Sequence, residues 1–121
     1  MKDIEDYCPS DKQDWRRWLE LNHNKKEAVW LIFYKKKSPN YNLSWNDSVD
    51  EALCFGWIDS TKKTIDKERY IQYFSRRKPN SIWSKVNKNK VAYLTSENLM
   101  QEAGYKTIEI AKENGLLVYF R

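Results

Sequence analysis

The sequence predicts an α+β fold, with a small antiparallel sheet of about three strands packed against four helices. Short runs of β-branched and aromatic residues, typical of strands, alternate with longer stretches whose apolar residues recur at helical spacing. The length of 121 residues suits one domain with its own core. No Pro- or Gly-rich linker and no repeat divides the chain, so residues 1–121 are expected to form a single domain.

Composition indicates a soluble protein. Charged residues make up 32% of the chain, and the mean hydropathy is −0.90. No apolar run approaches the roughly 18 residues that a membrane-spanning helix needs. The start, residues 1–6, lacks the pattern of a signal peptide, so we expect a cytoplasmic protein. Cys8 and Cys54 are too few for a disulfide framework or a metal cluster, and we expect both to be reduced thiols.

The first two predicted elements are a helix over residues 10–22 and a strand over residues 28–34. Ser10 is the expected N-cap, and an apolar stripe follows it, formed by Trp15, Trp18 and Leu19. His23 ends the helix and is the only histidine, which excludes a histidine-rich metal site and favours a solvated side chain. The strand is apolar throughout and is therefore expected to be central in the sheet.

The middle of the chain predicts a helix, a glycine corner and a strand. The helix covers residues 45–55, with Ser44 as N-cap, and Gly56 stands where a left-handed C-cap favours a residue without a Cβ. A strand follows over residues 57–63. Residues 70–74 form the next strand, so the two are expected to pair as an antiparallel hairpin.

The C-terminal third predicts two more helices. Pro79 ends the preceding strand, and Asn80 or Ser81 is the expected cap of a helix with apolar residues Ile82, Val86, Val91 and Leu94. The last helix spans residues 100–113 and is weakened in its first part by Gly104.

The apolar end, residues 116–121, is expected to be a further strand or the stump of a longer chain. The predicted core of the whole domain centres on Leu31, Phe33, Leu53, Phe55, Ile58 and Ile71.

The net charge of +5 is unevenly distributed. Residues 61–90 carry ten Lys or Arg against two acids, a net +8, and residues 25–37 carry +4, while the remaining segments sum to −7. One side of the protein is therefore expected to attract anions, although the same charges also suit a merely solubilising surface.

A binding site is predicted at the turn after the hairpin. Arg76, Arg77 and Lys78 precede the expected helix start at Ser81, where forked guanidinium donors and unpaired backbone N–H groups together suit an anion. The candidate ligand-binding residues are Trp57, Asp59, Arg76, Arg77, Ser81, Trp83 and Asn87. The structural alternative is an Arg76–Asp59 ion pair with the tryptophans in the core.

An enzyme has less support. Cys54 lies near a helix C-terminus, whose dipole raises rather than lowers a thiol pKa. The sequence contains no phosphate loop, no Ser-His-Asp set and no metal-ligand spacing. We therefore assign no catalytic residue, no metal ligand and no cofactor.

Several motifs together resemble one family. They are residues 50–59, the run Phe74-Ser75-Arg76-Arg77-Lys78, then Ser81-Ile82-Trp83-Ser84 with Asn87, and finally Met100 and Gly104. The stretch from about Trp15 to Gly115 is similar to the YdeI/OmpD-associated family, also called bacteriocin-protection proteins. The resemblance implies an α+β fold and a role in tolerance to bacteriocins or envelope stress. Such proteins usually continue into a second, helical region, so we expect this chain to be the first domain only.

Together these observations favour a domain that binds an anionic small molecule or a protein partner, with nucleic acid as a further but weaker anionic candidate. One alternative is a small enzyme that uses the region of Asp59 and Arg76. The other is an interaction module whose partner is its own missing C-terminal region. The sequence does not determine the oligomeric state.

Overall fold

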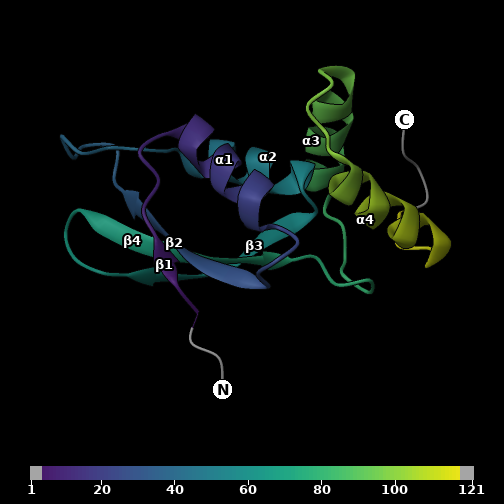
Figure 1. Ribbon diagram of the computed structural model, residues 1–121, viewed down its shortest axis with the longest axis horizontal. Helices are drawn as coiled ribbons and strands as arrows, with labels where there is room; N and C mark the ends of the chain where they lie inside the picture. The colour runs from purple at the N-terminus through teal and green to yellow at the C-terminus, as the bar shows by residue number, and fades with distance from the viewer. Residues whose placement is uncertain (1–3, 118–121) are drawn as a thin grey trace.

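The computed structural model describes residues 4–117, which form one small α+β domain with a mixed four-stranded sheet and four helices (Figure 1). The strands are β1 (Asp6–Tyr7), β2 (Ala28–Tyr34), β3 (Trp57–Thr64) and β4 (Arg69–Arg76). The helices are α1 (Lys12–Asn22), α2 (Trp45–Cys54), α3 (Lys85–Ser96) and α4 (Glu102–Glu113). Within residues 4–117, none of the helices is long and apolar enough to cross a membrane.

The sheet has the strand order β1-β2-β4-β3. The predicted hairpin is confirmed, since β3 and β4 pair antiparallel, with an irregularity between Asp59 and Lys62. Strand β2 is central, as predicted, and pairs antiparallel with β4. The fourth strand, β1, pairs parallel with β2 and makes the sheet mixed rather than wholly antiparallel. Two residues are too few to show an alternating pattern, so the sequence could not reveal this strand.

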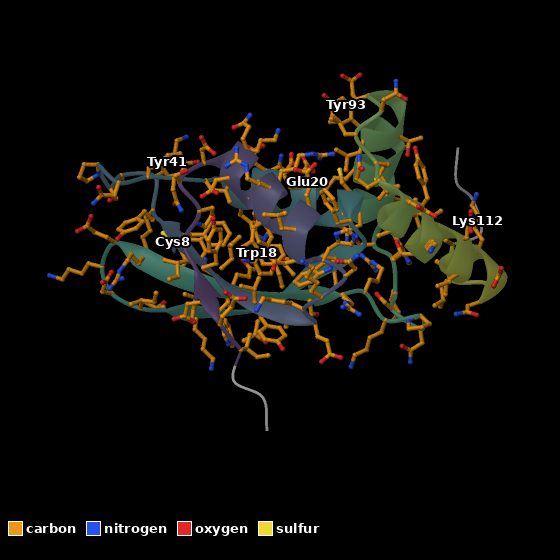
Figure 2. The ribbon with its side chains drawn as sticks, in the orientation of Figure 1. Cys8, Trp18, Glu20, Tyr41, Tyr93 and Lys112 are labelled. Atoms are coloured by element: carbon orange, nitrogen blue, oxygen red, sulfur yellow. The ribbon has the colours of Figure 1, made fainter. Side chains whose placement is uncertain are left out.

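The core lies between α1, α2 and one face of the sheet (Figure 1). Alternation along β2 places Val29, Leu31 and Phe33 on this face, where each is fully buried. Trp15 of α1 meets the ring of Phe74 edge-on at 5.3 Å between centroids. Figure 2 shows a second tryptophan of α1, Trp18, pointing toward the sheet. Aromatic side chains therefore supply much of the buried area of this small core.

The other face of the sheet carries no helix from the described part of the chain (Figure 1). Trp30 and Tyr73 lie on this open face and are half-buried. The prediction of Ile71 as a core residue was wrong, because alternation places it on the open face, where it is only half-buried. Ile58 is half-buried and packs against the core rather than at its centre. The other four predicted core residues are confirmed as buried.

The corner between α2 and β3 forms as predicted. The Ser44 hydroxyl accepts the backbone N–H of Asp47 at 3.0 Å, and Gly56 adopts a left-handed φ of +76°. At α1 the expected cap is wrong by one residue. Asp11, rather than Ser10, accepts a backbone N–H of the first turn through its carboxylate.

Helix α3 starts later than predicted. Ser84 is its N-cap and accepts the backbone N–H of Asn87 at 3.1 Å, so neither Asn80 nor Ser81 caps the helix. The hydroxyl of Ser81 is instead bonded to Arg77. The anion site was predicted to include the N-terminus of this helix, but the helix begins only at residue 85, well after the two arginines.

The inward face of α3 was predicted correctly only in its second half. Val91 and Leu94 are buried, whereas Ile82 and Val86 are 84% and 58% exposed because the helix starts later. Leu117 is 1% exposed and packs in the core. The predicted strand over residues 116–121 falls partly on residues 118–121, which lie outside the described residues.

Candidate anion-binding site

Arg77 follows β4 directly, and a backbone hydrogen bond fixes its position. Its N–H donates to the carbonyl of Gly56 at 2.9 Å, so the left-handed corner between α2 and β3 determines where the arginine lies. The residue is only 8% exposed. Arginine is seldom buried to this extent without a charged partner, which makes this side chain the starting point of the site.

Three neighbours orient the Arg77 guanidinium. Nη1 donates to the Ser81 hydroxyl at 2.6 Å and, less closely, to the carbonyl of Ile82 at 3.4 Å. The guanidinium carbon lies 3.8 Å from the ring centroid of Trp83, which is itself buried. This cation–π stacking fixes the plane of the fork.

The remaining donors of Arg77 are not used. Nε and Nη2 are buried and have no hydrogen-bond partner among the described residues. Burial lowers the pKa of Arg77 to about 10, opposed by the negative charge of Asp59, so the group stays charged at neutral pH. No carboxylate of residues 4–117 forms a salt bridge with it. A buried charge without a counter-charge and buried donors without acceptors both cost free energy. An external anion would supply the counter-charge and the acceptors together.

Arg77 lines two hollows. The sheet-face hollow, of about 700 Å³, lies against the open face of the sheet and also reaches Tyr73 and Ser81. The helix-side hollow, of about 420 Å³, lies toward α4 and reaches His23 and Lys106. Either space is large enough for a phosphate or a carboxylate group.

The sheet-face hollow is predominantly positive. Among residues 4–117, three cations line it, Arg76, Arg77 and Lys78, against one carboxylate, that of Glu27. Charge and the unused donors of Arg77 therefore point to the same kind of ligand.

Arg76 and Trp57 are tied to the connection between α1 and β2. Arg76 Nε donates to the carbonyls of His23 and Lys26 at 3.1 and 2.9 Å, and Trp57 Nε1 donates to that of His23 at 3.3 Å. Trp57 is 1% exposed and serves the core, as in the structural alternative. His23 was predicted to be solvated but is half-buried, with its ring 5.2 Å from that of Phe55.

Asp59 does not join Arg76. Its Oδ2 accepts hydrogen bonds from Trp45 Nε1 and from Gln72 Nε2, both at 2.9 Å. The Asp59–Arg76 ion pair of the structural alternative is absent from the salt bridges of residues 4–117. Asn87 lines neither hollow.

Of the seven candidate residues, the structure therefore unites Arg76, Arg77 and Ser81 in one hollow, with Trp83 behind the guanidinium. The sequence did not point to Glu27 and Ala28, which enter this hollow from β2 and the turn before it. Only the pairing of β2 with β4 brings these two residues to the hollow, and no local sequence pattern predicts that pairing.

Cys54 offers no reactive thiol. It is completely buried, and burial raises its pKa to about 11. The thiol therefore stays protonated at neutral pH, in line with the expectation from the helix C-terminus.

Comparisons with known proteins give two matches. A family model described as "Domain of unknown function (DUF8412)" matches residues 7–107. The protein ea47 of Escherichia phage lambda is 23% identical over 103 residues, which cover 78% of this chain and 25% of the phage protein. The chain thus spans about a quarter of the length of this curated relative. No solved structure matches.

Proposed function

Since the chain belongs to the DUF8412 family, whose members are described only as domains of unknown function, we propose a function from the site itself. The domain binds an anion, a phosphate or carboxylate group, through the Arg77 guanidinium. The observation that carries this proposal is the pair of buried donors, Nε and Nη2. Neither has a hydrogen-bond partner within residues 4–117, and Arg77 itself is only 8% exposed.

The surroundings of Arg77 support binding rather than chemistry. A forked guanidinium matches two oxygens of one phosphate or carboxylate, and its stacking on Trp83 means that little side-chain freedom is lost on binding. Arg76 and Lys78 add positive charge at the rim of the sheet-face hollow. Within residues 4–117 no cluster of His, Cys, Asp and Glu suited to a metal ion accompanies them.

The two alternatives have less support. An enzyme built on Asp59 and Arg76 lacks its central contact, because each side chain is bonded to other partners. An exposed apolar segment near Leu116 would favour a domain that docks its own C-terminal region, but Leu117 is buried in the core. The role in bacteriocin or stress tolerance stays a prediction, because the family match does not bear on it.

The test is an NMR titration of the labelled protein with inorganic phosphate and, separately, with acetate. We expect the amides of residues 76–84 to shift at millimolar ligand, and the shifts to shrink as added salt screens the charges. Arg77→Gln should abolish them, and Arg77→Lys should weaken them because it keeps the charge but loses the fork. Arg17→Gln is the matched control, since Arg17 is exposed on α1 and lines neither hollow.

The proposal is refuted if these amides stay still in the wild-type protein. It is equally refuted if Arg77→Lys, with a dispersed and folded spectrum, binds as tightly as Arg17→Gln. If Arg77→Gln fails to fold, Arg77→Lys still tests the site, because its binding can be compared with that of Arg17→Gln in the same way.

A further inference from the structure

We propose that the ligand class is single-stranded nucleic acid, with a phosphate held at Arg77 and unpaired bases stacked on Trp30 and Tyr73 of the open sheet face. This inference rests on the proposed anion site. It adds a second surface to that site, and this surface recognises a different part of the same ligand.

The aromatic surface adjoins the hollow directly. Tyr73 lines the sheet-face hollow, and its ring lies 4.9 Å from the ring of Trp30. The two residues are opposite each other in the β2–β4 register, so both side chains leave the same face. No described helix covers them, as Figure 1 shows, and both are half-buried rather than packed in the core.

Charge favours an anionic occupant for this face over an apolar one. Lys63 of β3 places Nζ 5.0 Å from the ring centroid of Trp30, so a cation stands at the aromatic pair. On the opposite side, β1 brings Asp6 to the register position beside Trp30. A phosphate backbone is therefore expected to run along β3 and β4, between Lys63 and Arg77, and away from β1.

The layout suits a chain of nucleotides. Tyr73 and Arg77 line the same sheet-face hollow, so a base over Tyr73 and a phosphate at Arg77 belong to one continuous site. A short single strand can occupy both positions at once. The bases must be unpaired, because a duplex buries its ring faces in its own stack.

The experiment measures fluorescence anisotropy of a short labelled oligothymidine, and of a duplex of equal length, with the intact chain. We expect the single strand to bind more tightly than the duplex. Trp30→Leu and Tyr73→Leu should each weaken oligothymidine binding by about 5- to 150-fold, the range of one lost base–aromatic stack. The control is Tyr93→Leu. Tyr93 is 59% exposed on α3, and Figure 2 shows it far from the sheet.

A phosphate titration of the same variants separates the two proposals. Trp30→Leu should keep the phosphate shifts at residues 76–84 while losing the oligonucleotide. If oligothymidine binding is the same in Trp30→Leu as in Tyr93→Leu, or if the duplex binds equally well, the inference fails and the anion site stands. If the wild-type protein does not bind phosphate, the proposed function fails and this inference fails with it.

Sedimentation of the wild-type protein tests the competing occupant, a second copy of the chain. A dimer that Trp30→Leu dissociates would show that the open face is an interface between copies, which overturns the inference. A monomer whose oligonucleotide complex has a one-to-one mass supports it.

Discussion

Replacing Gly104 by alanine should destabilise the protein, although alanine is the better helix former. Gly104 is buried in the first turn of α4 and faces the end of α2. A Cβ built there would lie 2.7 Å from Cε of Met100 and 2.9 Å from the carbonyl carbon of Cys54, and closer still to the oxygen of that carbonyl. The flexible methionine can move aside, but the backbone of Cys54 cannot move alone.

The expected magnitude follows from three contributions. In an exposed helix, Gly→Ala stabilises by about 1 kcal/mol. Overpacking a tight contact costs about 1–3 kcal/mol. The Cys54 carbonyl also accepts the backbone N–H of Gln101 at 2.9 Å, so moving it endangers a bond of about 0.5–1.5 kcal/mol. The net expectation for Gly104→Ala is a loss of about 0.5–3.5 kcal/mol in the free energy of unfolding.

Chemical denaturation measures this free energy, with Glu109 as an internal reference. Glu109 is exposed on the same helix, so Glu109→Ala should be about 1 kcal/mol more stable than Glu109→Gly. At position 104 the protein with glycine should instead be more stable than the variant with alanine. If Gly104→Ala is instead stabilising by about 1 kcal/mol, the close approach of α4 to α2 does not exist and the reasoning is refuted.

Two further predictions concern the thiols and acid stability. A thiol reagent at mildly alkaline pH should label Cys8, which is exposed. Cys54 should react only after unfolding, because it is buried and its pKa is raised to about 11. Rapid labelling of native Cys54 would contradict this. The pKa of Asp14 is lowered in the folded protein, chiefly by the hydrogen bond from the backbone N–H of Ser10. The ionised carboxylate therefore stabilises the fold at pH values above its unfolded pKa of about 3.9. This stabilisation is lost as the pH falls through the lower folded pKa. Asp14→Asn should therefore lose stability less steeply in acid denaturation, and equal slopes would show that the carboxylate is not linked to folding.

Local chemistry explains which elements could be predicted. The β2 strand, the Ser44 cap and the Gly56 corner each depend on residues that lie within a few positions of one another. The same is true of the link from Arg77 to Ser81 and Trp83, which spans only seven residues. That part of the candidate site was therefore visible in the sequence.

Competing local patterns explain the errors of detail. Ser81 and Ser84 both stand before an apolar helical stretch, and sequence spacing alone does not rank them. The structure chooses Ser84, since the buried Arg77 bonds the hydroxyl of Ser81. Likewise, the sequence predicted that Gly104 only weakens its helix. The need for glycine there comes from the close contact with Cys54, which lies fifty residues away in the chain.

By itself, the sequence determined an α+β domain, most of its elements and a basic, arginine-rich turn after the hairpin. Only the tertiary structure decided three features of the described part of the chain. Arg77 is buried there without a charged partner, Asp59 and Arg76 stay apart, and Trp30 and Tyr73 share a face that no described helix covers. The physical reason is the range of the interactions. Capping and periodicity act between neighbours in the chain, whereas burial and pairing depend on how β2 and β4 meet and on which face the helices cover.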